Sequence, residues 1–215
     1  TPCTSHRCRC NRRSARPSSS SSSPPRTARR PSANREAQLA EHCPVLLRAA
    51  ARLGSQQIRA VATLGGNLAN ASPCADTATP LLVHEASVVL CSAAGKRRLP
   101  LEAFFIGPKT TCLGPAEIIE AVELETPSAA SRAVFLKQGR VHMDRAMGSL
   151  CARLELKGNR CARAWVAAGS VAPTPVRLRA AERVLAGQEL GPDVIAAAVS
   201  AALDEVTPIT DIRAS

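Results

Sequence analysis

The sequence predicts an α+β fold: a mixed first part followed by an antiparallel sheet with packed helices. Three observations lead to this prediction. Apolar residues recur at helical spacing over residues 36–53. Residues 146–156 and 160–169 flank a Lys-Gly-Asn turn, which predicts a long antiparallel hairpin. From Arg177 onward the apolar spacing is helical again. The change of pattern near residue 126 suggests a joint between two parts.

Shorter elements lie between these three. Asp76 stands where it can cap a short helical turn that runs through Leu82 and Val83. The last part predicts two helices, residues 178–185 and 194–203. Strands are expected at residues 58–63, 87–91, 97–99, 117–124 and 133–138.

The positive charge of the chain is concentrated at its beginning. Residues 1–35 hold nine Arg and no acidic residue, whereas residues 36–215 hold 19 Lys and Arg against 17 Asp and Glu. The leader, residues 1–35, also contains a run of six Ser from Ser18 to Ser23 and almost no large apolar side chain, so we predict that it is disordered. An acid-free leader rich in Arg and Ser is also compatible with a transit peptide or a nucleic-acid-binding arm, although it shows no amphipathic apolar face.

The body of the chain lacks the signals of a nucleic-acid-binding module. Aromatic residues make up only 2% of the sequence and Tyr is absent, whereas base-stacking modules need aromatic platforms. The nine Cys are scattered, and no two show the two-residue gap of zinc or iron–sulfur sites. With no secretory signal and no apolar run of 18 residues, we expect a cytoplasmic protein that has no membrane span. None of the four His is placed as a catalytic base, and we expect each on the surface or in a loop.

A glycine pair after the first predicted strand carries the clearest chemical signal. Adjacent Gly65 and Gly66 allow positive φ and expose consecutive N–H groups, an arrangement that suits a pyrophosphate. Asn67 adds a hydrogen-bonding side chain. These residues alone favour an ordinary glycine turn with local Asx bonds. A dinucleotide fingerprint of the G-x-G-x-x-G type and a P-loop are both absent from the sequence.

A longer stretch around this pair resembles a known family. Residues Thr63 to Pro73 read TLGGNLANASP and are followed by Asp76. This string is similar to the second FAD-binding loop in the flavoprotein subunits of the molybdenum hydroxylases, such as xanthine dehydrogenase and the carbon monoxide dehydrogenase medium chain. The resemblance covers residues 39–215. Further landmarks follow in the family's order: Gln57-Ile58-Arg59, Phe104-Phe105, Gly107, Thr110, Leu113, Glu117-Ile118-Ile119, Phe135, Lys137, residues 172–177 and Ala181-Glu182.

The resemblance implies both domains and site residues. It divides the chain after the leader into a partial FAD-binding domain, residues 36–126, and a flavoprotein C-terminal domain, residues 127–215. In the family, the motif lies along the flavin pyrophosphate, an acid contacts FAD, and further positions approach the flavin ring. Ordinary core packing is an alternative for Leu53 and Ile119, a solvated strand position for Lys137, and a structural ion pair for Arg140 with Asp144. The implied cofactor-binding residues are Leu53, Thr63, Leu64, Gly65, Gly66, Asn67, Asp76, Ile119 and Lys137, with no catalytic and no metal-binding residue.

The resemblance also implies a function. Such a subunit binds FAD and passes electrons from iron–sulfur centres to NAD, oxygen or a quinone. Molybdopterin is expected on a large partner subunit and [2Fe–2S] clusters on a small one; nucleic acid is not an expected partner. The family also has an earlier Gly-Gly loop, whereas residues 1–53 contain no glycine, and relatives continue beyond the segment that ends here at Ser215. We therefore expect a truncated member that binds flavin weakly, with a flavin-less remnant or assembly subunit as the alternative.

Overall fold

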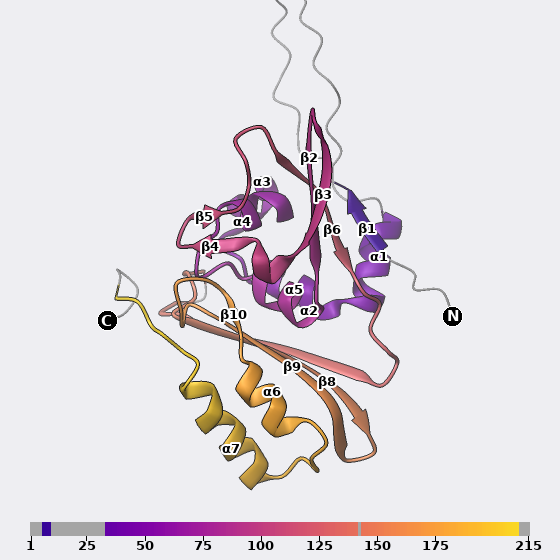
Figure 1. Cartoon of the computed structure of the whole chain (residues 1–215), viewed down its shortest axis with the longest axis vertical. Helices are drawn as coiled ribbons and strands as arrows, with labels where there is room; N and C mark the ends of the chain where they lie inside the picture. Colours follow the sequence, from indigo (N-terminus) through magenta and orange to yellow (C-terminus); the bar gives the residue numbers. More distant parts are fainter. Residues whose placement is uncertain (1–5, 10–32, 142, 211–215) are drawn as a thin grey trace, which may run out of the picture.

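Two four-stranded antiparallel sheets organise the computed structural model, which describes residues 6–9, 33–141 and 143–210 (Figure 1). The first sheet has the order β1-β6-β2-β3, and the second has the order β10-β9-β8-β7. A short pair, β4 (Phe105–Gly107) and β5 (Thr110–Thr111), follows the 3₁₀ turn η1 (Leu101–Ala103). The first sheet consists of β1 (His6–Arg9), β6 (Ile118–Leu124), β2 (Ser87–Ser92) and β3 (Gly95–Pro100). The second consists of β10 (Val176–Arg177), β9 (Arg160–Gly169), β8 (Gly148–Lys157) and β7 (Ser131–Gln138).

Among the described residues, five helices precede β2 and two follow β10. In the described residues, none of them is long and apolar enough to cross a membrane. The early helices are α1 (Ala33–His42), α2 (Pro44–Ala51), α3 (Gln56–Val61), α4 (Leu64–Ala69) and α5 (Ala78–Val83). The late ones are α6 (Arg179–Leu185) and α7 (Pro192–Leu203).

Helix α5 lies between the first sheet and the second (Figure 1). All six of its residues are buried, and it contacts both β8 and β9. The larger hydrophobic core joins this helix to Phe135, Cys151 and Trp165 of the second sheet. Both halves of the chain therefore bury apolar side chains in one shared core.

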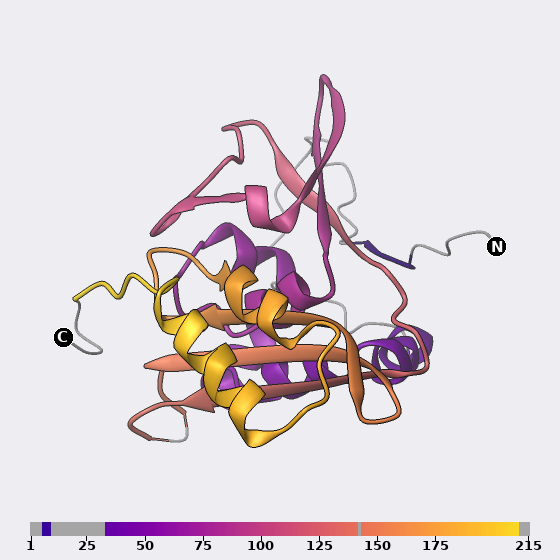
Figure 2. The same ribbon diagram turned by 60° about the horizontal axis from the view of Figure 1, so that its bottom comes forward.

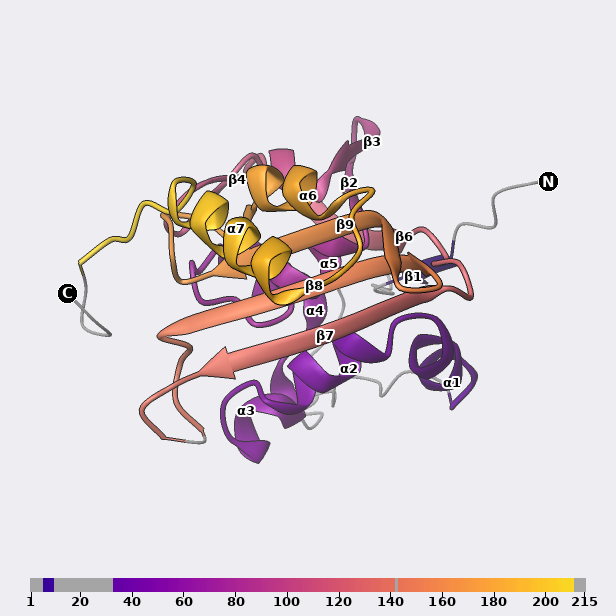
Figure 3. The ribbon, with the colours of Figure 1, turned by 90° about the horizontal axis from the view of Figure 1, so that it is seen from below.

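A smaller core lies on the opposite face of the second sheet. Successive β-strand residues point to opposite faces, so Trp165 and Ala167 of β9 join the larger core while Val166 and Ala168 join the smaller one. Helices α6 and α7 cover this second face (Figures 2 and 3). The C-terminal part is thus a sheet with α6 and α7 on one face and the helices of the first half on the other.

Most predicted elements of the α+β fold are confirmed. The hairpin of β8 and β9, the paired strands β2 and β3, and the strands β6 and β7 lie within a few residues of their expected positions. Helices α6 and α7 also match the prediction.

Two predictions about residues 36–63 are wrong. The helix expected over residues 36–53 is two helices, because Pro44 lacks an N–H and instead occupies the first turn of α2. The strand expected at residues 58–63 is helix α3, which begins after the cap residue Ser55, whose side chain accepts from the Ile58 N–H at 3.4 Å. This short segment buries none of its side chains, so its β-branched residues gain nothing from a sheet.

The leader, predicted to be disordered, contains strand β1. Residues His6–Arg9 pair antiparallel with β6, in the register His6 with Leu124. The edge of a sheet offers unpaired N–H and C=O groups, so backbone pairing there needs no apolar side chain. The remaining leader residues, 1–5 and 10–32, lie outside the described part of the chain.

Candidate functional site

The Gly-Gly motif forms the first turn of helix α4, not the positive-φ nest that we predicted. Thr63 is the N-cap residue, and its Oγ1 accepts from the Gly66 N–H at 3.0 Å. Its carbonyl accepts from the Asn67 N–H at 3.0 Å. Neither Gly65 nor Gly66 has positive φ. The cap at Thr63 starts the helix here and outweighs the poor helix propensity of two glycines.

The two glycines differ in how tightly they are packed. A Cβ on Gly65 would lie 3.7 Å from the Cβ of Ile119 on β6, which is an ordinary van der Waals contact. A Cβ on Gly66 would lie 2.9 Å from Thr63 Oγ1 and would press on the cap. Gly66 is exposed, and α4 itself supplies no acceptor for the N–H groups of Leu64 and Gly65. The start of α4 therefore presents two N–H groups that have no partner within the helix, and these favour an anionic group.

A side-chain hydrogen bond ties this helix to the start of α5. Asn67 Oδ1 accepts from Thr77 Oγ1 at 2.6 Å. Leu64 and Ile119 are partly buried and pack against the larger core, so core packing holds for both. The structure thus brings six of the predicted residues, Thr63 to Asn67 and Ile119, to one end of α4.

Next to Thr77, Asp76 forms a buried ion pair with Lys137 of β7. Lys137 Nζ lies 2.7 Å from Asp76 Oδ2, and the two side chains are only 3% and 6% exposed. Burial raises the pKa of the Asp76 carboxyl above its ordinary value, and the Lys137 ammonium opposes that shift. The other oxygen, Asp76 Oδ1, is buried and has no hydrogen-bond partner among the described residues. The expected capping role of Asp76 is wrong, because Thr77 holds the cap position of α5 and the carboxylate turns to Lys137.

Lys137 is also tied to the end of α2. Its Nζ donates to the Arg52 carbonyl at 3.0 Å, and Arg52 donates back to the Lys137 carbonyl at 3.2 Å. Lys137 is therefore not a solvated strand lysine. A surface hollow opens beside it, lined by Arg52, Lys137, Gln138, Gly139, Arg140 and Val141. Leu53 follows Arg52 in the chain and is half-buried.

Sequence reasoning missed Arg52, whose partner Lys137 lies 85 residues away in the chain, and Thr77, whose partner Asn67 lies on another helix. It correctly proposed an ion pair between Arg140 and Asp144, whose atoms lie 2.9 Å apart. His84 lies in the turn after α5, but it is 2% exposed and therefore not on the surface. Both ring nitrogens of His84 lack a hydrogen-bond partner in the described residues, and burial lowers its pKa to about 4.

The second sheet also holds the end of the motif. The Ser170 N–H donates to the Pro73 carbonyl at 2.8 Å. Gly169 allows this approach, because a Cβ there would lie 2.6 Å from Ser149 Oγ and 3.3 Å from Thr79 Cγ2. The candidate site is therefore carried by α4 and the start of α5 and is held in place by β7 and β9.

Comparison with known proteins agrees with both halves of this arrangement. Residues 29–127 match the family model of the FAD binding domain in molybdopterin dehydrogenase. Residues 133–215 match the model of the CO dehydrogenase flavoprotein C-terminal domain. The chain belongs to the FAD-binding subunits of the molybdenum hydroxylase family. FAD is the cofactor of this family.

Individual relatives and solved structures lead to the same family. The xanthine dehydrogenase FAD-binding subunit of Escherichia coli O157:H7 is 32% identical over 81% of this chain and 60% of its own length. The glyceraldehyde dehydrogenase medium chain of Sulfolobus acidocaldarius is 30% identical over 80% of this chain and 61% of its own. Carbon monoxide dehydrogenase from Hydrogenophaga pseudoflava superposes with a TM-score of 0.80 at 28% identity, over 82% of this chain and 62% of that chain. The chain thus spans about 60% of the length of the curated relatives that it matches.

The described residues fit an FAD group on two counts. The start of α4 offers backbone N–H groups with no side chain on Gly65 or Gly66 to obstruct a pyrophosphate. Asp76 Oδ1 is a buried acceptor without a donor, as expected where a ligand hydroxyl belongs.

Proposed function

We propose that the chain is the FAD-binding electron-transfer subunit of a molybdenum-containing hydroxylase or dehydrogenase. The bare N-terminus of α4, joined through Asn67 and Thr77 to the buried Asp76–Lys137 pair, is the observation that carries this proposal. The proposed cofactor-binding residues are Leu53, Thr63, Leu64, Gly65, Gly66, Asn67, Asp76, Ile119 and Lys137.

Two regions of the site have different tasks in this proposal. The N–H groups of Leu64 and Gly65 bind the pyrophosphate, while Thr63 keeps the helix start in place through its bond to Gly66. Asp76 accepts from a hydroxyl group of the cofactor through Oδ1. Lys137 has three donors and uses two of them, on Asp76 and Arg52, so one remains for the cofactor.

The cofactor supplies a ring that takes up and releases electrons singly or in pairs. The ammonium of Lys137 and the guanidinium groups of Arg52 and Arg140 line the hollow beside the ring's proposed place. Their positive charge stabilises electron density there. Leu53 and Ile119 limit the access of water from the protein side.

The wider role rests on the relatives. A molybdopterin-binding large subunit oxidises the organic substrate, and a small subunit with [2Fe–2S] clusters delivers electrons to this chain, which passes them to an acceptor. The relatives include medium chains and a subunit of a named dehydrogenase complex, which supports assembly with other chains. We propose that this assembly is cytoplasmic.

Titration of the purified chain with FAD tests the site, with quenching of free flavin fluorescence as the signal. Gly66→Ala places a Cβ against the Thr63 cap and should weaken FAD binding by about tenfold or more, roughly 1.4 kcal/mol. Gly191→Ala is the matched control: it adds the same methyl group in open space before α7 and should leave the affinity unchanged. Equal affinities in the two variants would contradict the proposed place of the pyrophosphate.

The same titration separates the main proposal from its alternative, a flavin-less remnant or assembly subunit. Residues 1–53 contain no glycine, so that segment holds no second Gly-Gly loop. Saturable but weak binding supports the electron-transfer role. Absence of any saturable binding supports the alternative, and a stoichiometric yellow protein after purification would contradict the expectation of weak binding.

A further inference from the structure

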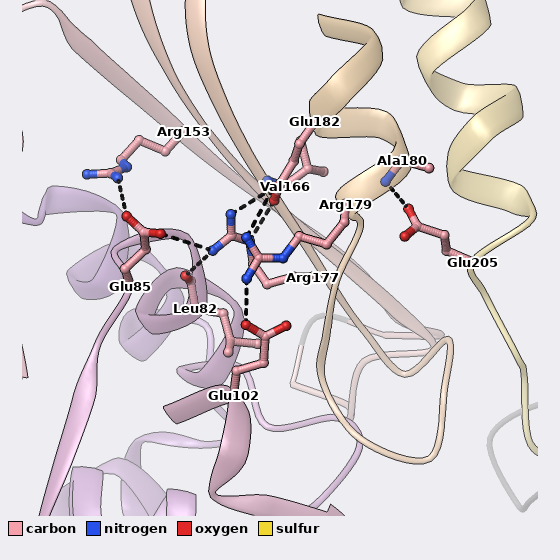
Figure 4. A network of polar contacts seen from close by, with 10 residues as sticks. All are labelled: Leu82, Glu85, Glu102, Arg153, Val166, Arg177, Arg179, Ala180, Glu182 and Glu205. Carbon is pink, nitrogen blue, oxygen red and sulfur yellow. Dashed lines mark hydrogen bonds and ion pairs between the residues drawn. The ribbon is translucent and has the colours of Figure 1, made fainter. Parts of the chain in front are cut away.

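A buried arginine of the C-terminal half, Arg177, contacts the far end of α5 (Figure 4). Its side chain is 2% exposed. Nε and Nη2 donate to the two carboxylate oxygens of Glu182 at 2.6 and 2.8 Å. Glu182 Oε1 also accepts from the Val166 N–H of β9 at 2.8 Å. The guanidinium is thus fixed by a bidentate pair that is itself bound to the sheet.

The third contact of Arg177 crosses to the first half of the chain. Nη1 donates to the Leu82 carbonyl, in the last turn of α5, at 3.2 Å. The same carbonyl accepts from the Glu85 N–H at 3.0 Å. Carbonyls in a last turn lack partners within the helix and carry partial negative charge, so a cation is favoured here. Arg177 therefore holds the C-terminal end of α5 on the second sheet.

The opposite end of α5 is held in a similar way. Asp76 pairs with Lys137 of β7, and Thr77 donates to Asn67 of α4. Two cations of one sheet, Lys137 and Arg177, thus hold the two ends of one buried six-residue helix. A helix of this length spans about 9 Å and moves as a rigid unit, so a shift at Leu82 also displaces Thr77 and Asp76.

We propose that Arg177 is a positioning residue for the FAD site, although it lies at the other end of α5 from that site. It fixes the helix that presents Asp76 and Thr77, and through Thr77 it fixes Asn67 of the Gly-Gly motif. The inference rests on the proposed function for the identity of the ligand. Its mechanical part, the coupling of Arg177 to α4 through α5, does not depend on that ligand.

A second ion pair across the same two halves provides a matched control. Arg179 and Glu102 lie 2.6 Å apart, but their side chains are 45% and 49% exposed. The pair ends on η1, and Arg179 Nη1 also lies 3.6 Å from Glu182 Oε2, the partner of Arg177. Glu102→Gln therefore removes a charge and an ion pair at the same interface, while the Glu182 carboxylate keeps both of its arginine partners.

The test measures FAD affinity and hydrogen–deuterium exchange in the full chain. Arg177→Lys keeps the positive charge but loses the bidentate pair with Glu182. It should weaken FAD binding by about tenfold and raise amide exchange at residues 63–70 and 76–84. Glu102→Gln should leave the affinity within about twofold and the exchange at both segments unchanged. The double variant Arg177→Met with Glu182→Leu leaves no unpaired buried charge and should repeat the result if Arg177→Lys fails to fold.

The outcomes separate the two proposals. If the unmodified chain does not bind FAD, the proposed function fails, and the exchange data alone decide the coupling. Raised exchange confined to residues 176–182, with 63–70 and 76–84 unchanged, would overturn the positioning role. So would an unchanged FAD affinity in a folded Arg177 variant of a chain that does bind FAD.

Discussion

The ion pairs of β3 in the first sheet differ in burial from those of Lys137 and Arg177 in the second. On the first sheet, Lys96, Arg97 and Arg98 of β3 pair with glutamates at 2.6, 2.7 and 2.9 Å, and the cation of each pair is about half exposed. On the second sheet, Lys137 and Arg177 are 3% and 2% exposed, and both contact helices of the first half.

This difference separates replaceable charges from those that fix the architecture. An exposed pair is screened by water and salt and adds little to stability. A buried pair adds little over an apolar pair of the same shape, but losing one partner leaves the other charge buried and alone. The buried cations of the second sheet therefore determine where the first half docks, and hence where the candidate site lies.

The largest expected effect comes from breaking the buried pair at Lys137. Lys137→Met removes the only cation bonded to Asp76 among the described residues and should cost about 3–5 kcal/mol in the free energy of unfolding. Urea unfolding followed by circular dichroism measures this loss. The double variant with Asp76→Leu should recover most of it, because no unpaired charge then remains buried.

The pH dependence of the stability of the Lys137→Met variant tests independently whether Asp76 is left as an unpaired buried charge. Burial already raises the pKa of Asp76, and loss of the ammonium that opposes this shift raises it further. The folded variant then binds a proton more tightly than its unfolded chain, so its stability falls as pH rises towards the folded-state pKa. The destabilisation should be smaller at pH 5 than at pH 8. A loss that is the same at both pH values would contradict an unpaired Asp76 charge.

A smaller effect is expected at His84, which lies on the buried side of the second sheet beside Arg153. Burial, and then the charge of Arg153, lower the pKa of His84 to about 4. In the unfolded chain, His84 binds a proton near its ordinary pKa of about 6.5. The stability that depends on a neutral His84 is therefore fully present above that pH and is lost as pH falls towards 4. The loss should approach about 3 kcal/mol.

A variant isolates the His84 contribution from the other titrating groups. Asp76, with its raised pKa, changes stability with the opposite sign over part of the same range. His84→Gln keeps a polar side chain that does not titrate, so the difference in stability between the two proteins should shrink or reverse as pH falls from 7 to 4. A constant difference across that range would show that His84 does not titrate as a buried group.

The sequence predicts the fold well wherever the residue pattern within one element is enough to determine its conformation. The hairpin of β8 and β9 follows from its turn and its alternation, and α6 and α7 follow from their apolar spacing. Helix α3 and the first turn of α4 were missed, because the caps Ser55 and Thr63 outweigh the strand propensity of Ile58 and the flexibility of two glycines.

The candidate site was predicted as a set of residues but not as an arrangement. The resemblance selects both Asp76 and Lys137, and the structure places the two side chains in contact. Their direct contact, 61 residues apart in the chain, depends on how the second sheet docks. The contribution of Arg52 depends on the same docking. Its guanidinium donates to the Lys137 carbonyl, and its own carbonyl accepts from Lys137 Nζ. Both acceptors are backbone carbonyls, which any residue type provides.

The smallest effect is expected from the exposed pair of Arg97 with Glu117. This pair is bidentate, at 2.7 Å for both bonds, and the hydrogen bonds from Arg97 lower the pKa of Glu117 to about 2. The contribution is therefore present above the ordinary carboxyl pKa of about 4.3 and is lost as pH falls towards 2. Because water and ions reach this pair, Arg97→Gln should shift the urea midpoint by about a tenth of the shift caused by Lys137→Met.

In about 1 M NaCl the Arg97 effect should nearly vanish, whereas the Lys137 effect persists because a buried pair is poorly screened. Equal salt sensitivity of the two variants would mean that the contrast between the sheets reflects geometry alone and not the dielectric environment of their charges.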